Sequence, residues 1–166
     1  HIPVSDDREA KCTCGNYGCL EAVASGAALA RKARHLVARG EDALLLQMCE
    51  GDLERLEAKM VFAAARMGDE NARRMIDETA EFIGVALAAC INLLDPDRIY
   101  LCGGMMKNGP EFLEKIRACT LRKQMHNAGR RVVILQGDPD EWNVARGAAQ
   151  VVPYYDWKKE SLAFMR

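Results

Sequence analysis

The chain has 166 residues, of which 49% are hydrophobic and 28% are charged, and its formal net charge is −1. This balance is ordinary for one soluble domain with a core of its own. A net charge so close to zero gives no electrostatic argument for a nucleic-acid or membrane surface. The longest apolar run, Gly84 to Leu94, is shorter than the ~18 residues that a membrane-spanning helix needs. We therefore expect a cytoplasmic protein.

The beginning of the chain is unusual. It opens on His1 instead of methionine, and its first dozen residues show no periodic pattern. We interpret the chain as a fragment of a larger protein. It contains no internal repeat and no low-complexity linker, so residues 1–166 are expected to form a single domain.

The first half of the chain is predicted to be helical. Apolar residues at helical spacing predict a helix over residues 26–39, which Gly40 ends, and a second helix over residues 59–67. A long core helix is expected over residues 70–94, with Asp69 as its N-cap and Pro96 just beyond its end.

The second half alternates between strands and helices. Residues 98–102 (RIYLC) and 131–135 (RVVIL) are predicted strands, separated by a helix over residues 110–125 that starts at a proline. A last helix is expected over residues 143–152. This order predicts a helix-rich α/β layer with parallel strands.

The segment CTCGNYGCLE, residues 12–21, gathers three cysteines around two glycines. Zinc prefers four tetrahedral thiolate or imidazole ligands, so Cys12, Cys14 and Cys19 leave one position open, and His1 is the nearest residue able to fill it. The alternative is a loop of reduced cysteines that merely pack, or an adventitious disulfide. The remaining cysteines are expected to behave as small buried hydrophobes: Cys49, Cys90, Cys102 and Cys119.

The pattern CxCGxxGCxE preceded by a histidine resembles the zinc motif of the ROK family of repressors, open reading frames and sugar kinases. The likeness continues through GCLEAVASGAAL, GDENARRMI, NLLDPDRIYLCGG and ARGAAQ, in order, to about Val152. It implies an actin-like, ribonuclease-H-like fold of two lobes, of which this chain is the C-terminal lobe. That lobe would contain a zinc loop over residues 1–21 and a body over residues 22–152; residues 153–166 match nothing in the family pattern.

The resemblance also implies roles for single residues. His1 matches a histidine that both ligates zinc and touches the sugar, and the three clustered cysteines match the other ligands. Glu21 matches a glutamate that accepts hydrogen bonds from sugar hydroxyls; alone, it could equally be a solvated residue in the first turn of a helix. Gly103 and Gly104 match a pair beside the nucleotide phosphates, although a tight turn without a ligand would look the same.

Some parts of the family pattern are missing from the chain. It contains neither the DxGxT phosphate loop nor the aspartate that acts as general base on the sugar, so we expect no catalysis from this chain alone. The parent is expected to be a kinase that uses ATP and Mg²⁺ on a hexose or an N-acetylhexosamine. The alternatives are the sugar-sensing domain of a repressor that binds DNA, and a zinc-stabilised interaction domain. The resemblance implies a homodimer or homotetramer, because members of the family commonly form these assemblies. The apolar surface of the long helix favours the same prediction.

Overall fold

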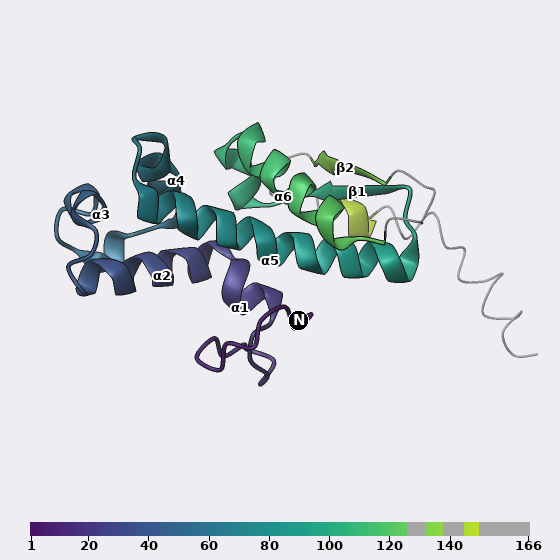
Figure 1. The fold of residues 1–166 in the computed structure, drawn as a ribbon, viewed down its shortest axis with the longest axis horizontal. Coiled ribbons are helices and arrows are strands. Elements are labelled where there is room, and N and C mark those ends of the chain that lie inside the picture. The colour runs from purple at the N-terminus through teal and green to yellow at the C-terminus, as the bar shows by residue number, and fades with distance from the viewer. Residues whose placement is uncertain (126–131, 138–144, 150–166) are drawn as a thin grey trace, which may run out of the picture.

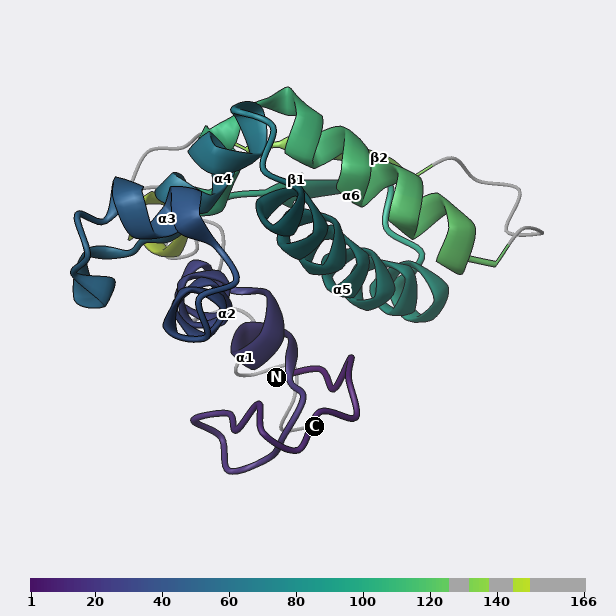
Figure 2. The ribbon, with the colours of Figure 1, turned by 60° about the vertical axis from the view of Figure 1, so that its left-hand side comes forward.

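A single long helix, α5 (Glu70–Leu94), organises the computed structural model, which describes residues 1–125, 132–137 and 145–149 (Figure 1). Helix α6 (Pro110–Lys123) packs along one side of α5. Helices α1 (Leu20–Ala24) and α2 (Gly26–Ala38) pack on its other side, so α5 lies between two helical layers (Figure 2).

Helix α5 has the start and the end that the sequence predicts. The Asp69 carboxylate accepts a hydrogen bond from the backbone N–H of Ala72 at 2.7 Å and so caps the first turn. At the other end, Asp95 adopts a left-handed conformation with φ 42°, which stops the helix before Pro96.

The segment between α2 and α5 holds more structure than the sequence analysis predicted. Helix α4 (Ala58–Arg66) was predicted, but the short helix α3 (Ala43–Met48) and the 3-10 turn η1 (Leu53–Arg55) were not. Each is capped by an aspartate: Asp42 accepts from the N–H of Leu45, and Asp52 accepts from the N–H of Glu54. A six-residue apolar stretch is too short to show helical periodicity, so the caps were the available signal.

The two strands form a parallel pair, as predicted. Strand β1 (Arg98–Leu101) pairs with β2 (Val133–Gln136), with Arg98 opposite Val133. The second strand starts two residues later than predicted, and residue 131 lies outside the described segments. The 3-10 helix η2 (Gly104–Asn108) and α6 make the connection between the strands.

The C-terminal predictions are covered only in part. Residues 145–149 are helical, in agreement with the expected helix over 143–152, whose two ends lie outside the described residues. The segment 153–166 also lies outside them. Within the described segments, no helix is both long and apolar enough to cross a membrane.

Two separate groups of buried side chains stabilise this arrangement. The main core lies among α2, α4, α5 and α6. A much smaller core lies under the N-terminal loop and includes two of the clustered cysteines, Cys12 and Cys19. Its other buried members are Ala10, Ala22, Val23 and Ala24. The loop itself lies outside the helical layers, beyond α1 (Figure 1), so it has little apolar burial to hold it in place.

Candidate functional site

Backbone pairing within the N-terminal loop brings His1 to the cysteines. Pro3 forms an antiparallel bridge with Cys19, and the N–H of Leu20 donates to the carbonyl of Ile2 at 2.9 Å. A second antiparallel bridge joins Lys11 to Tyr17 and folds the intervening residues into a tight loop. Histidine and cysteines that are eleven or more residues apart are thereby held at one place.

Gly18 is required at the crossing of these loop segments. Its φ is +66°, and its N–H donates to the carbonyl of Ala10. A Cβ atom at this position would lie only 1.8 Å from the carbonyl oxygen of Ser5. No other residue fits here without moving the backbone, because both the conformation and the space exclude a side chain.

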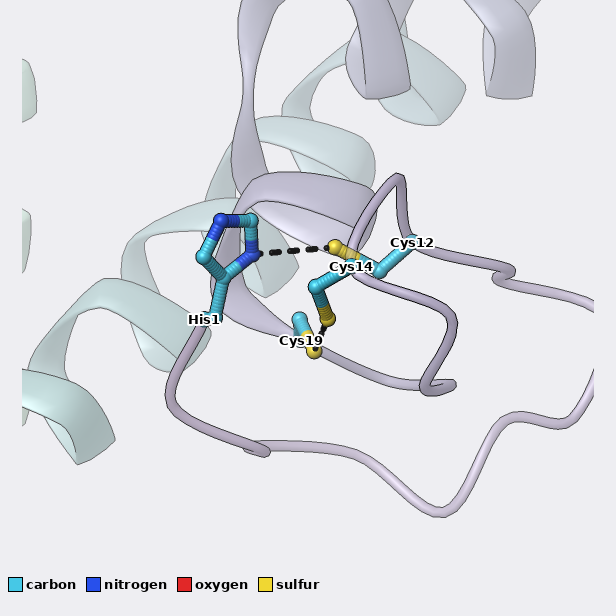
Figure 3. A group of neighbouring side chains, drawn as sticks. All are labelled: His1, Cys12, Cys14 and Cys19. Atoms are coloured by element: carbon cyan, nitrogen blue, oxygen red, sulfur yellow. Dashed lines mark hydrogen bonds between the residues drawn. The ribbon is translucent and has the colours of Figure 1, made fainter.

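Four possible metal ligands converge in this loop. One ligand atom from each of His1, Cys12, Cys14 and Cys19 lies within 4.8 Å of all the others (Figure 3). The Nδ1 atom of His1 is 3.2 Å from the sulfur of Cys12, and the sulfurs of Cys14 and Cys19 are 3.7 Å apart. Tetrahedral zinc with its usual bond lengths separates its ligands by roughly 3.5–3.8 Å. The donor set and its spacing therefore fit a zinc ion.

The same distances argue against a disulfide. All seven cysteines lie in the described segments and are free thiols, and 3.7 Å between the sulfurs of Cys14 and Cys19 far exceeds the ~2.05 Å of an S–S bond. The backbone N–H of Cys14 lowers the pKa of the Cys12 thiol, whereas burial raises the pKa of Cys19 to about 11. Metal binding at Cys19 would have to displace a proton.

The burial predicted for the four other cysteines is confirmed for only some of them. Cys49 and Cys119 are buried, as expected of small hydrophobes, and Cys90 is half-buried. Cys102 is exposed, so the expectation of burial was wrong for this residue. Its position explains the difference, since it follows the last residue of β1 and directly precedes Gly103 and Gly104, which are also exposed.

Glu21 lies directly beside the cysteine cluster. It occupies the first turn of α1, and its carboxylate is 3.6 Å from Nδ1 of His1. Both side chains are 55% exposed, so their polar atoms are available to a ligand. Because α1 follows Cys19 without a break, the direction of the Glu21 side chain depends on how the loop is held.

The glycine pair and the Glu21 region, two separate candidates in the sequence, lie at the same concave surface. His1, Glu21, Gly103 and Gly104 line a groove of about 440 Å³, which we call the first groove. Gly103 has a φ of +109° and turns the chain from β1 into η2. The groove is completed mainly by apolar side chains: Leu20, Ala24, Ile83, Leu101, Met105, Met106, Phe112 and Ile116.

A second groove, which the sequence analysis missed, continues from the first. The two share Gly26, Gly104 and Met105, and the second has a volume of about 670 Å³. Its walls come from α2, the start of α4, and η2, and they carry Arg34, Lys59 and Lys107 among small apolar residues. Alanines and single lysines carry no motif, so no sequence pattern pointed to this surface.

A comparison with known protein families identifies the chain. The model of the ROK family matches residues 1–154. This chain therefore belongs to the ROK family, as its cysteine motif implied.

Related proteins include both enzymes and regulators. The chain is 34% identical over 145 residues to a glucokinase of Halalkalibacterium halodurans, covering 83% of this chain and 43% of that protein. It is 30% identical over 119 residues to the DNA-binding transcriptional dual regulator NagC of Escherichia coli, covering 72% of this chain and 28% of that protein. The chain thus spans less than half the length of these relatives.

Solved structures give the same two classes. A ROK family glucokinase from Streptomyces griseus, in complex with glucose and AMPPNP, superimposes with a TM-score of 0.68 at 33% identity, over 82% of this chain and 44% of that one. A ROK family transcriptional regulator homologous to the Escherichia coli MLC protein gives a TM-score of 0.61 at 28% identity, over 81% of this chain and 33% of that one.

Proposed function

We propose that this chain is the sugar-binding lobe, actin-like in fold, of a cytoplasmic ATP-dependent sugar kinase. The observation that carries the proposal is the first groove, whose lining includes both His1 and Glu21 and the glycine pair Gly103 and Gly104. A kinase must bring a sugar hydroxyl and a phosphate group together, and one continuous groove with a carboxylate and a flexible glycine pair suits that task.

In this proposal Glu21 and His1 hold the sugar. An ionised carboxylate accepts hydrogen bonds from hydroxyl groups, and such charge-assisted bonds are the stronger ones. The Nδ1 atom of His1 faces Cys12 and Glu21, which leaves the other ring nitrogen for a ligand. The expected sugar is a hexose or an N-acetylhexosamine.

Zinc has a structural role in this proposal, held by His1, Cys12, Cys14 and Cys19. A bound ion would fix a loop that has only a small core beneath it, and would thereby fix the start of α1 and the carboxylate of Glu21. All four positions are protein ligands, so this site has no open position for a reacting water.

ATP would occupy both grooves, with its phosphates at Gly103 and Gly104. The second groove shares Gly104 with the first, and its lining combines small apolar residues with Lys59 and Lys107, which suits the base and ribose of a nucleotide. The phosphate loop and the general-base aspartate would be supplied by the remainder of the protein, and Mg²⁺ would bind with ATP, because the part of this chain that matches covers only 43% and 44% of its kinase relatives. We also propose that the protein is a homodimer or homotetramer.

A second function is favoured by the regulator relatives. In that case the same groove would bind the sugar as an effector, and DNA would be bound by a segment outside this chain. The identity to NagC and the fit to the regulator structure support this alternative. The described residues contain no basic recognition helix for DNA that would distinguish a repressor from a kinase.

The test is a coupled ATP-consumption assay on the full-length protein with a panel of hexoses and N-acetylhexosamines. Turnover with one sugar, lost in Glu21→Ala, is the expected result. Sugar binding that depends on Glu21 but supports no ATP turnover would overturn the kinase proposal in favour of the repressor. Absence of both sugar binding and turnover would overturn both functions.

A further inference from the structure

The side chain of Arg34 joins helix α2 to the turn η1 and to Leu56, which follows it. Its Nε atom donates to the carbonyl of Leu53 at 2.9 Å, and its Nη2 atom donates to the carbonyls of Leu56 at 3.1 Å and Glu54 at 3.3 Å. One guanidinium therefore holds three backbone carbonyls of the turn η1 and the residue that follows it. The guanidinium suits this role because it presents five N–H donors in a fixed plane.

These carbonyls lie where the chain turns from η1 into α4. Leu56 is fully buried, and the next three residues, Glu57, Ala58 and Lys59, form one wall of the second groove. Arg34 holds the carbonyl of Leu56, and the core holds the side chain of Leu56. These two contacts together fix the direction in which the chain leaves the turn to form this wall.

The wall meets the other two sides of the groove at close range. A Cβ atom on Gly26 of α2 would lie 3.6 Å from the Cβ of Ala58 and 3.7 Å from Cγ of Met105. The space between Gly26 and these two side chains is therefore no wider than a methyl group, and Gly26 and Met105 line both grooves. A small shift of the start of α4 would change the width of the groove there.

We propose that Arg34 is a positioning residue that sets the width of the nucleotide-binding groove by anchoring the 53–56 turn to α2. The inference rests on the proposed function, in which the nucleotide lies in the second groove. Arg34 also lines that groove, but its role here is exerted through the backbone carbonyls it holds. Its neighbour Arg31 has a different task, since it donates to the carbonyl of Ala22 in α1 at 2.7 Å.

The experiment uses the full-length protein and two ligands measured separately. Titration calorimetry with a non-hydrolysable ATP analogue and with the preferred sugar is performed on the wild type, Arg34→Lys and Arg34→Gln. Both variants lose the fork, and the lysine keeps the charge. We expect each variant to bind the ATP analogue about tenfold more weakly, the scale of about one lost hydrogen bond to a charged group, and the sugar within about twofold of the wild type. The KM for ATP should rise in parallel while the KM for sugar does not.

Arg39→Lys is the matched control. Arg39 follows the last residue of the same helix and is exposed, where its side chain pairs with Glu41, so this variant should bind both ligands as the wild type does. Thermal unfolding of all variants reports on stability in parallel.

The possible outcomes distinguish a failure of the positioning role of Arg34 from a failure of the proposed function. If Arg34→Lys binds the ATP analogue like the wild type, charge alone is sufficient and the positioning role is wrong, whereas the proposed function stands. If both ligands weaken equally together with a fall in Tm, Arg34 is a general stabilising residue and the inference is also wrong. If the wild type binds no ATP analogue at all, the proposed function itself fails and the inference fails with it.

Discussion

A Cβ atom on Gly84 of α5 would lie 2.6 Å from the Cβ of Cys119 on α6, so the two helices approach each other at a position where α5 has no side chain. The backbone N–H of Thr120 would be only 3.0 Å from the same atom. Both neighbouring atoms belong to, or are attached directly to, the backbone of α6. They cannot move aside as the end of a flexible side chain could.

Replacement of this glycine should therefore destabilise the protein. In an exposed helix, Gly→Ala stabilises by roughly 0.5–1 kcal/mol, but here the added methyl group would force α5 and α6 apart, at a cost of about 1–3 kcal/mol. We predict that Gly84→Ala lowers the free energy of unfolding, measured by urea denaturation. An unchanged or higher value would show that the helices adjust without strain.

The metal content of the protein tests the ligand set. Purified without chelator, the full-length protein should contain about one zinc per chain by elemental analysis. Cys14→Ser should reduce this value strongly, since it removes one of four ligands while changing an exposed side chain. Cys90→Ser, at a half-buried position outside the cluster, is the control and should retain the metal. Zinc near zero in the wild type would remove the Cys3His site.

Two glycines of the loop should respond differently to the same substitution. Both Gly15 and Gly18 have positive φ, but nothing lies within 4 Å of a Cβ on Gly15, whereas a Cβ on Gly18 would overlap the carbonyl of Ser5. Gly15→Ala should thus cost only the ~1–2 kcal/mol of a strained backbone and keep its zinc. Gly18→Ala should lose zinc, because the crossing of the loop segments cannot form. Equal metal content in the two variants would contradict this account of the loop.

Asp42 should make stability depend on pH. Its carboxylate caps α3 through Leu45, yet its second oxygen is buried without a hydrogen-bond partner in the described residues, and burial, with repulsion from Asp69, raises its pKa. A carboxyl whose folded pKa is raised opposes folding when ionised, and this penalty disappears as pH falls through the folded pKa. Asp42→Asn has no charge and therefore no such penalty.

The stability of Asp42→Asn relative to the wild type should be greatest near pH 7 and should decline toward pH 4. Thermal unfolding at a series of pH values measures this difference. Asp42→Ala, which also loses the cap, should be less stable than Asp42→Asn by about 1 kcal/mol. A difference between Asn and wild type that does not change with pH would mean that Asp42 titrates normally in the folded protein.

Much of the fold was predictable because its signals are local. Residues 70–94 carry an apolar stripe, an aspartate cap and a following proline, and each of these acts within a few residues. The parallel pairing of the strands followed from a helix lying between them. Helix α3 was missed because six residues do not show a period, and the burial of Cys102 was mispredicted because exposure depends on where a strand ends in the layer.

The site was predictable only in its parts. The CxCGxxGC spacing and His1 indicated a metal cluster, since the chemistry of thiolates and imidazole is carried by the residues themselves. That Glu21 and Gly103 line one groove depends on how α1 and β1 pack against α5, which no local pattern records. The anchoring of the 53–56 turn by Arg34 was invisible for the same reason, because its partners are backbone carbonyls about 20 residues away.

The measurement that tests the central claim most directly is sugar binding to the full-length protein by calorimetry, comparing the wild type with Glu21→Gln. The amide replaces the charge and keeps the shape, and the loss of charge-assisted hydrogen bonds should weaken binding by about 10- to 100-fold. Glu9→Gln makes the same change at an exposed position in the same loop, away from the groove, and should bind sugar normally. If Glu21→Gln binds the sugar as tightly as the wild type, the groove between His1 and Gly104 is not the sugar site.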